Sequence, residues 1–324
     1  MFLTNFSFSQ DIHWSQFDYN PVFQNPANVG QFNGGDYRFH ANYRDQWRSV
    51  TVPFQTFSVS GEAKSILHDN LSLGAFIFND VTGDGQFRTI EIQPSASWTF
   101  KLTPDSTHLL RVGAQVGLNY RQFNADAFTF DSQWNGTFFD PGLPTEEIFV
   151  TQRRTNATFG IGASYEFFKT KKARVTGGVG LFNINRPNQG FFGDEILRNR
   201  RFNLFAKGEY KIDLDWDILP SIQLNLQGTY RELIMGSQAR YTMNDRLGEY
   251  LAVVFGGYLR GGDAAYIVGG VEWQNWWAGI SYDVNFSKLY VASRARGGIE
   301  FSLRYILKTY KPDNRLFRVC PDYI

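Results

Sequence analysis

Residues 110–121 read LRVGAQVGLNYR, and apolar and polar residues alternate through the whole of this stretch. Side chains point alternately to the two faces of a β-strand, so the pattern predicts a strand with one apolar and one polar face. The stretch has 12 residues, about twice the usual length of a strand in a soluble protein. Strict alternation over about 10 residues is what a tilted membrane-spanning strand requires.

The same alternation recurs along the chain. It is clearest in YRFHANYR (37–44), ATFGIGASYEF (157–167) and GIEFSLRYI (298–306). Further runs of the same kind lie near residues 54–62, 70–79, 88–100, 173–184, 201–211, 219–227, 232–241, 250–259, 264–273 and 277–284. Together these stretches predict about fourteen strands, an even number, as bacterial single-chain barrels have.

The composition limits the class of protein. The 324 residues are 17% aromatic and 19% charged, with a net charge of +1. Disordered chains lack aromatic residues and carry a large net charge, so disorder is excluded. The chain has no run of about 18 apolar residues, and this excludes a membrane-spanning helix. It also has no long basic block, so nothing in the charge pattern points to a nucleic-acid partner. A single cysteine, Cys320, and four histidines exclude an internal disulfide and a zinc site of the usual spacing.

The two faces of the predicted strands indicate that the solvent outside them is lipid. A soluble β-sandwich would have shorter strands and dense charge on its polar faces. Here the polar faces carry Gly, Ser, Asn and Gln with scattered charges, and Tyr, Trp and Phe gather near the strand ends, as in interfacial girdles. Strands in lipid must close into a barrel, because an open edge leaves backbone groups unpaired. We therefore predict an all-β fold, a closed transmembrane antiparallel barrel of about 14 strands with a lumen that is plugged.

The barrel is expected to cover residues 37–307. Its flanks are predicted to be a signal-peptide remnant at 1–9, an N-terminal periplasmic or plug segment at 10–36 and a C-terminal periplasmic tail at 308–324. Asn25-Pro26-Ala27 lies in the second of these. It could belong to a segment that folds into the lumen and blocks it, since a lumen of fourteen strands is wide enough to need filling or to hold water. It could equally be a turn that merely starts the barrel.

Charged residues of both signs are predicted to face the lumen. By the alternation these are Glu166, Lys207, Glu209, Glu232, Arg240, Glu272, Asp283, Glu300 and Arg304. Internal ion pairs are the simpler reading of this set, and selectivity for a passing solute is the alternative.

Catalytic and metal sites find little support. By the alternation His40 points into the lumen among Arg38 and Arg44, where no Ser or Asp can be paired with it, and His13, His68 and His108 are expected in periplasmic or loop segments. In NDVTGDGQF (79–87) the residue order of a calcium-binding EF-hand fails, so a hairpin turn is expected there. We predict no enzyme, no cofactor and no metal.

The longest interruption of the alternation is residues 122–155. Long loops of outer-membrane barrels face outward, whereas turns on the periplasmic side are short. Exposed aromatic side chains favour contact with a partner, so the loop predicts a partner surface formed by Phe128, Phe130, Trp134, Phe138 and Phe139. A loop that folds over and caps the barrel is the alternative.

Several motifs resemble one known family. The start DIHWSQFDYNPVFQNPANVG (11–30) is similar to the mature start of PorP/SprF-family proteins, outer-membrane barrels of the type IX secretion system of Bacteroidota. The similarity continues in NYRDQW (42–47), NRPNQGFF (185–192), LPSIQLNLQG (219–228), GGYLRGGDAA (256–265), SYDVNFSKL (281–289), GGIEFSLRYI (297–306) and the pair Cys320-Pro321. Each motif is weak alone, but their joint order across the chain is specific.

The resemblance implies a non-enzymatic protein of the outer membrane of a Gram-negative bacterium. Members are needed to export particular surface adhesins, including gliding adhesins, or to hold them at the cell surface. The implied partners are the C-terminal domain of the adhesin, the periplasmic lipoprotein ring of the machine and the lipid and lipopolysaccharide of the membrane. The residues that carry the motifs are Asn25, Pro26, Ala27, Gly30, Tyr43, Arg44, Gln46, Trp47, Pro187, Gln227, Gly228, Arg260, Asp263, Asp283, Lys288 and Leu289.

The sequence departs from the family pattern at two points, and two other functions are also considered. The signal peptide is incomplete, and about 17 residues follow the last predicted strand, so the chain does not end at a strand-terminal aromatic residue. A FadL-like channel for a small solute, which also has an NPA-containing N-terminus, is the main alternative. A barrel hydrolase is the third hypothesis.

Overall fold

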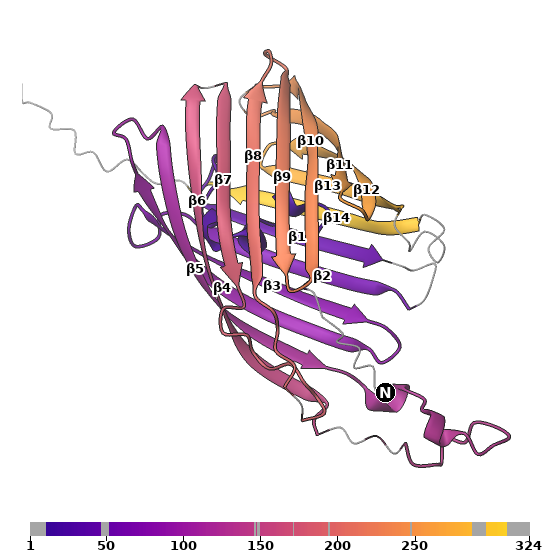
Figure 1. The fold of residues 1–324 in the computed structure, drawn as a ribbon. Coiled ribbons are helices and arrows are strands. Elements are labelled where there is room, and N and C mark those ends of the chain that lie inside the picture. Colours follow the sequence, from indigo (N-terminus) through magenta and orange to yellow (C-terminus); the bar gives the residue numbers. More distant parts are fainter. Residues whose placement is uncertain are drawn as a thin grey trace, which may run out of the picture.

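The chain folds into a closed barrel of fourteen antiparallel strands in a computed structural model that describes residues 11–46, 52–145, 147, 150–170, 172–193, 195–246, 248–286 and 296–309 (Figure 1). The predicted closed antiparallel barrel and its number of strands are confirmed. The strands are β1 (Tyr37–Gln46), β2 (Phe54–Ala63), β3 (Leu71–Thr82), β4 (Phe87–Lys101), β5 (His108–Gln122), β6 (Arg153–Thr170), β7 (Ala173–Phe182), β8 (Arg201–Lys211), β9 (Trp216–Gln227), β10 (Tyr230–Asn244), β11 (Leu251–Arg260), β12 (Ala264–Trp273), β13 (Trp276–Asn285) and β14 (Arg296–Leu307).

Closure occurs between the first and the last strand. β1 pairs with β14 from Tyr37 opposite Leu307 to Asp45 opposite Ile299, and every other strand pairs with its neighbours in sequence. No sheet edge is left open, as backbone in lipid requires. Within the described residues, no helix is long and apolar enough to cross a membrane.

Helices are short and lie outside the strands. Three of them come before β1, namely η1 (Phe17–Tyr19), α1 (Pro21–Gln24) and η2 (Pro26–Asn28). Two lie between β5 and β6, namely η3 (Ala125–Ala127) and η4 (Asp131–Gln133).

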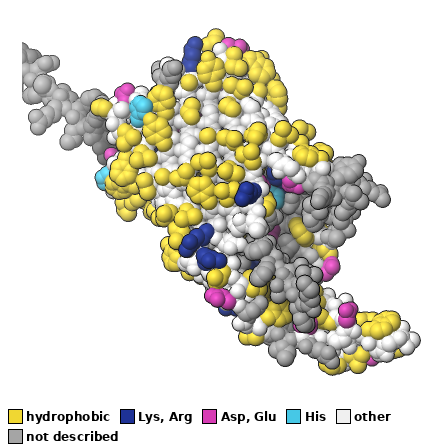
Figure 2. Space-filling model, in the orientation of Figure 1, with side chains coloured by type: hydrophobic (Ala, Val, Ile, Leu, Met, Phe, Trp, Pro, Cys, Tyr) yellow, Lys and Arg dark blue, Asp and Glu magenta, His cyan; other side chains and the backbone are white. Residues whose placement is uncertain are grey.

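The alternation read from residues 110–121 separates the two faces of the barrel wall. Val116 on the apolar face is 51% exposed, whereas Asn119 on the polar face is 1% exposed. The same division holds in the other strands, so the outer surface of the wall is largely apolar (Figure 2). Solvent exposure here means exposure to lipid, which is why so many large apolar side chains remain uncovered.

The barrel has two unlike ends. β1 begins and β14 ends at one of them, which we call the terminal end; in Figure 1 it lies at the upper left. The opposite end, the loop end, carries the two long connections 123–152 and 183–200. Barrels of this class place their longer loops outside the cell, so the loop end corresponds to the external side and the terminal end to the periplasmic side.

Aromatic side chains surround the terminal end of the wall. Trp216 packs beside Tyr241 with ring centroids 4.8 Å apart, and Trp276 beside Tyr305 at 4.3 Å. Amphipathic rings favour the membrane–water boundary, so this belt indicates where lipid ends. His108, which was expected in a loop or periplasmic segment, is instead the first residue of β5 at this end.

The turn at residues 83–86 joins β3 to β4 as a tight hairpin at the loop end. Gly83 has a φ of +67°, and its carbonyl accepts a hydrogen bond from Gln86 N at 3.1 Å. Positive φ is easy for glycine, so Gly83 favours the hairpin turn that was predicted for this stretch.

The hydrophobic core lies inside the barrel, between the wall and the residues that precede β1. Trp14, Val22, Phe23 and Val29 pack against Phe76 and Phe78 of β3. Phe17 packs against a second group from β10, β11 and β12, namely Ile234, Tyr258, Tyr266 and Val268. The lumen therefore contains a packed chain segment, residues 11–36, which we call the inner segment.

Candidate functional site

The inner segment contacts the barrel wall along most of its length. It starts at the loop end, where Asp11 N donates to Gln227 Oε1 of β9 at 2.8 Å. It ends at the terminal end, where Asp36 N donates to Leu307 O of β14 at 2.9 Å. Between these points it is almost entirely buried as far as Val29. Because it lacks a strand or a long helix of its own, its position is fixed by these contacts with the wall.

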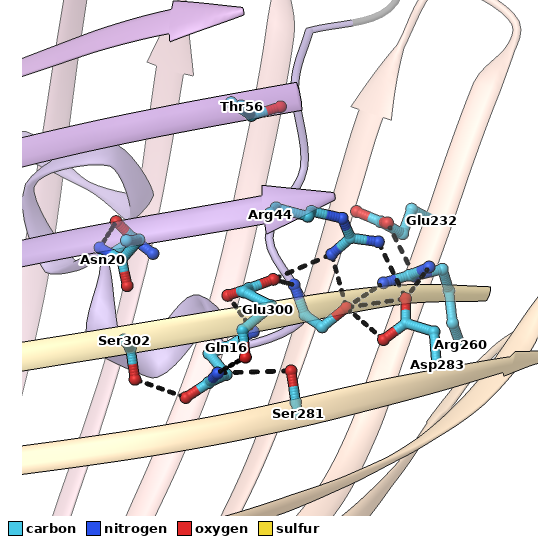
Figure 3. Close-up of polar contacts among 12 residues, drawn as sticks. Gln16, Asn20, Arg44, Thr56, Glu232, Arg260, Ser281, Asp283, Glu300 and Ser302 are labelled. Atoms are coloured by element: carbon cyan, nitrogen blue, oxygen red, sulfur yellow. Dashed lines mark hydrogen bonds and ion pairs between the residues drawn. The ribbon is translucent and has the colours of Figure 1, made fainter. Parts of the chain in front are cut away.

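A buried ion-pair network holds residues 15 and 16 (Figure 3). Arg44 of β1 pairs with Asp283 of β13 at 2.8 Å and with Glu300 of β14 at 3.0 Å. Ser15 Oγ donates to Asp283 at 2.7 Å, and Ser15 N donates to Glu300 at 2.8 Å. Gln16 N donates to the other Glu300 oxygen at 3.0 Å. Two carboxylates and one guanidinium of the wall thus enclose one turn of backbone.

A second arginine extends this network across the lumen. Arg260 of β11 lies 3.3 Å from Asp283 and 3.3 Å from Glu232 of β10, and its Nη2 donates to Ser15 Oγ at 3.0 Å. It also reaches Asp263, which is more exposed, at 3.3 Å. The charges compensate each other inside the barrel. Removal of one partner from such a buried pair leaves an uncompensated charge and costs about 3–5 kcal/mol.

Three residues of the sequence motifs, Arg44, Arg260 and Asp283, therefore meet at one point although they come from distant parts of the chain. Sequence reasoning missed Ser15 and Gln16, which complete the network. Gln16 also accepts from Ser302 at 2.6 Å. The signal that could have found them is the polar character of SQ in DIHWSQF, which suits a lumen rather than a leader sequence.

The Asn25-Pro26-Ala27 motif lies against the wall formed by β5, β6 and β7. Asn25 Nδ2 donates to Val179 O at 2.8 Å, and Asn25 Oδ1 accepts from Ala27 N at 2.8 Å. The Asn25 side chain therefore links β7 to the start of η2, whose first residue is Pro26. Proline suits the first position of a helix because its missing N–H would have no partner there.

Two glycines make room for this motif. A Cβ at Gly113 of β5 would overlap the backbone of Pro26 and Ala27, and one at Gly162 of β6 would overlap the Asn25 side chain. Both glycines face the lumen in the alternation of their strands. Glycine is thus required here for the close approach of two backbones.

The end of the inner segment is held at Gly30, another motif residue. Gly30 N donates to Glu62 of β2 at 2.9 Å, and the same carboxylate pairs with Arg38 of β1 at 2.8 Å. Gly30 has a φ of +77°, and a Cβ there would overlap Ser72. Any residue other than glycine is therefore unfavourable at position 30, because of the positive φ and because Ser72 occupies the space.

The beginning of the inner segment is held by arginines from the loop end. Asp11 pairs with Arg198 at 2.7 Å and with Arg201 at 3.4 Å. Arg198 also pairs with Glu91 of β4 at 3.0 Å. Burial alone raises the pKa of Asp11, but Arg198 and Arg201 outweigh it and hold the pKa at about 2.

Two other titratable groups of the inner segment are affected mainly by burial. Burial raises the pKa of Asp18, against the opposing effect of Lys207 and of hydrogen bonds from Ser221 and Tyr258. Burial and the nearby Arg260 and Arg44 lower the pKa of His13 well below its usual value. Both shifts favour the neutral form inside the lumen.

Apart from Lys207, the predicted lumen charges form ion pairs, as the simpler interpretation expected. Arg240 pairs with Glu209 at 2.5 Å, with Asp217 at 2.7 Å and with Glu272 at 3.8 Å. Further pairs are Arg304 with Glu272 at 2.9 Å, Arg111 with Glu166 at 2.5 Å and Arg174 with Glu166 at 3.5 Å. His40 faces the lumen as predicted and is 5% exposed.

Cavities remain on both sides of the inner segment. One of about 230 Å³ at the loop end is lined by Asp11, Asp80, Arg121 and Arg198 among others. Another of about 200 Å³ extends from Asp18 and Tyr19 toward the terminal end. The two cavities share no lining residue, and each is lined in part by residues of the inner segment.

The loop at 123–152 presents most of the predicted aromatic surface. Phe128, Trp134, Phe138 and Phe139 are exposed, with Phe138 at 59%, whereas Phe130 is half-buried. The loop is not loose at its base. Phe123 is buried and packs against Phe191 of the other long loop with ring centroids 5.0 Å apart.

Of the remaining motif residues, Gln46 contacts Arg44 of the network and the others lie elsewhere. Tyr43 OH donates to Asp45 at 3.4 Å on β1, and Gly228 forms the β9–β10 turn with a φ of +60°. Gln46, with its amide oxygen turned toward Arg44, accepts from it at 2.6 Å. Pro187 O accepts from Arg198 N at 3.0 Å. The other predicted positions, namely Trp47, Lys288, Leu289 and Cys320, lie outside the described residues.

A metal centre finds no basis among the described residues, which contain no group of three or more His, Cys, Asp or Glu side chains able to hold an ion. The buried carboxylates are instead engaged by guanidinium groups and by backbone N–H groups of the inner segment. This arrangement can anchor a segment and can hold charge in a lumen.

Comparisons with known proteins agree with this picture. A family model described as "Type IX secretion system membrane protein PorP/SprF" matches residues 6–305. No curated protein matches the sequence.

Among solved structures, the toluene transporter TbuX of Ralstonia pickettii is similar, with a TM-score of 0.54 and 11% identity over 90% of this chain and 94% of that one. The monoaromatic hydrocarbon channel CymD gives 0.51 and 10% over 90% and 94%. The toluene transporter TodX of Pseudomonas putida gives 0.50 and 9% over 88% and 92%. At such identities the similarity concerns the fold alone.

Proposed function

We propose a docking function from one premise: the chain belongs to the family of type IX secretion system membrane proteins called PorP/SprF, and is therefore an outer-membrane component of that system. In this proposal the protein is required to export a specific surface adhesin or to anchor it at the cell surface. It acts by protein–protein contact and not by passage of a solute. The adhesin is held through its C-terminal domain, and the periplasmic lipoprotein ring contacts the terminal end.

The observation that carries the proposal is the seating of the inner segment by hydrogen bonds to buried charges of the wall and by the ion pairs of Asp11. Arg44, Arg260 and Asp283 of the wall enclose Ser15, and Asp11 is held between Arg198 and Arg201. Opening the lumen would break the hydrogen bonds of Ser15 and Gln16 to Asp283 and Glu300, each worth about 1.5–3 kcal/mol, and would separate Asp11 from Arg198 and Arg201. This supports a lumen that stays plugged while the protein works.

The exposed aromatic residues of the loop at 123–152 supply a surface for the adhesin. Trp134, Phe138 and Phe139 lie at the loop end, which corresponds to the external side. Exposed aromatic side chains commonly provide the residues that dominate binding energy at protein interfaces. A plugged barrel that carries such a loop fits an anchor better than a channel.

Two measurements on the whole protein test the proposal. In planar bilayers the purified barrel is expected to show no stable conductance. In cells, the double substitution Trp134→Ser and Phe138→Ser is expected to release the adhesin into the medium or block its export, while the barrel still folds. The matched control is Leu67→Ser, which changes a fully accessible side chain in the short β2–β3 connection at the opposite end.

The opposite outcome is equally well defined. A stable open conductance with preference for a small solute, together with normal adhesin display in the loop variant, would support the FadL-like channel and contradict docking. Recovery of the adhesin C-terminal domain or of ring proteins with the purified barrel would support docking.

A further inference from the structure

The terminal end of the lumen contains a charged opening that the inner segment leaves uncovered. A cavity of about 430 Å³ lies there between the ends of β6, β7, β8 and β9, lined by Lys172, Arg174 and Lys211 among others. It shares Arg174, Glu209 and Arg240 with the 200 Å³ cavity that reaches Asp18. We call the two together the vestibule.

The acids of the vestibule already have partners. Arg240 pairs with Glu209 and Asp217, and Arg304 pairs with Glu272. On the nearby turn, Asp213 Oδ1 accepts from the backbone N–H groups of residues 215 and 216 at 2.9 and 2.8 Å. Little carboxylate capacity therefore remains for further cations.

Three lysines of the vestibule have no such partner. Within the described part of the chain, Lys172, Lys207 and Lys211 form no ion pair with a carboxylate. Lys207 is half-buried and its ammonium lies 5.9 Å from the ring centroid of Phe205. Asp18 is the carboxylate that acts most strongly on it, but the two form no direct ion pair. A half-buried ammonium without a directly bound anion is in an unfavourable state, and a carboxylate that reaches it would relieve this.

The walls of the vestibule are also partly apolar. Phe168 lines its mouth, and Leu219 and Pro220 of β9 line its inner part. Inorganic phosphate would use only the charges, whereas a peptide with alternating acidic and apolar side chains would use both kinds of surface. The opening faces the periplasmic side.

We propose that the vestibule binds an acidic, partly apolar peptide segment of a periplasmic partner, with a carboxylate of that segment on Lys207. This inference rests on the proposed docking function, and it names the chemistry of the partner at the terminal end. Lys172 and Lys211 attract the segment at the mouth, because complementary charge accelerates encounter and selects partners. Asp18 at the floor limits how deep a carboxylate can go.

The test uses the full chain in detergent and a labelled hexapeptide of alternating glutamate and leucine, measured by fluorescence anisotropy. Binding that weakens as salt rises is expected, since salt screens such charges. Lys207→Gln should weaken binding about tenfold or more, as expected for loss of one hydrogen bond to a charged group. Asp18→Asn should tighten it, because Asp18 no longer competes with the peptide carboxylate for Lys207. The control Lys101→Gln, an exposed lysine at the same end outside the vestibule, should change nothing.

Several results would overturn the proposal. They are equal loss of binding in the Lys101 and Lys207 variants, unchanged binding in the Lys207 variant, or displacement of the peptide by equimolar phosphate. Folding of each variant is verified by its heat-dependent mobility in detergent gels. The loop variants of the preceding section keep an intact vestibule, so adhesin release and peptide binding are lost independently and failure of one proposal can be told from failure of the other.

Discussion

The inner segment and the loop at 123–152 are both irregular chain attached to the same barrel, yet they differ in almost every contact. The inner segment is buried, and its polar groups meet charges of the wall, as Ser15 meets Asp283 and Gly30 meets Glu62. The loop leaves Trp134 and Phe138 uncovered. The barrel therefore holds one irregular region through hydrogen bonds to charged groups of the wall, whereas the other region presents its aromatic side chains.

This difference has a physical origin. A polar segment inside a barrel must find partners for its backbone groups, because an unsatisfied buried group costs about 1–3 kcal/mol. A loop at the membrane surface has water for that purpose. The backbone groups of both irregular regions need hydrogen-bond partners. Charged wall residues supply them inside the barrel, whereas water supplies them in the loop and leaves its aromatic side chains exposed.

The largest effect is expected from removal of the Arg44 guanidinium, which contacts Ser15 of the inner segment. Arg44→Met leaves Asp283 and Glu300 buried with less compensation, so we expect a loss of about 3–5 kcal/mol in unfolding free energy. Urea unfolding followed by tryptophan fluorescence measures it, and bilayer conductance shows whether the inner segment leaves the lumen. Arg174→Met is the control, because that arginine is 32% exposed and its ion pairs are longer; a loss of at most about 1 kcal/mol is expected there. Equal losses in both variants would contradict the assigned role of the network.

The next largest effect is steric. Gly113→Val places a side chain where the backbone of Pro26 and Ala27 lies, and overpacking of this kind costs about 1–3 kcal/mol. Faster cleavage of the inner segment by added protease is the expected readout. Gly269→Val is the control, because nothing lies within 4 Å of a Cβ there. If both variants resist protease equally, the close approach at β5 does not hold the motif.

The effect of pH comes third. The pKa of Asp11 is held at about 2, below the ordinary value of 3.8, so its charged form stabilises the folded state. That contribution is fully present above pH 3.8 and is lost as pH falls through 2. A shift of this size corresponds to about 2 kcal/mol.

Unfolding measured between pH 5 and pH 2 tests this sign. The wild-type chain is expected to lose stability over that window and Asp11→Asn to lose about 2 kcal/mol less. Asp105→Asn, at an exposed turn of the terminal end, is the matched control. A pH dependence that survives in the Asp11 variant would show that another carboxylate is responsible.

The smallest effect on stability is expected in the displayed region, and it would sharpen the contrast. Trp134→Ser with Phe138→Ser should change the unfolding free energy by at most about 0.5 kcal/mol, since surface substitutions away from packing features usually do. Phe123→Ser in the same loop should destabilise the protein more, because Phe123 is buried against Phe191. Equal effects of the two changes would mean that the aromatic surface is part of the core.

Most of the barrel could be predicted from the sequence because alternation is a local property. Each residue of 110–121 indicates its own face, and Val116 and Asn119 lie as that pattern requires. Closure followed from the cost of open edges in lipid. The strand number followed from the count of alternating runs.

The interior of the barrel could be predicted only in part. The motif residues Arg44, Arg260 and Asp283 were identified, but their meeting point was not, since pairing across a lumen depends on barrel stagger and not on local pattern. Ser15 and Gln16 were missed because the inner segment has no periodicity, and their polar character alone does not indicate which wall residues they meet. The fit of Asn25-Pro26-Ala27 against Gly113 and Gly162 is likewise tertiary.

The connection between Ser15 and Glu300 joins residues that are 285 positions apart in the chain, and Gln16 meets Ser302 over a separation of 286. Contacts so distant in sequence are formed late and slowly during folding. The inner segment is synthesised first, but its anchors on β13 and β14 are synthesised last. The contacts of Ser15 and Gln16 therefore cannot form until β13 and β14 have been made, so the last strands of the barrel complete the binding surface for one of its first segments.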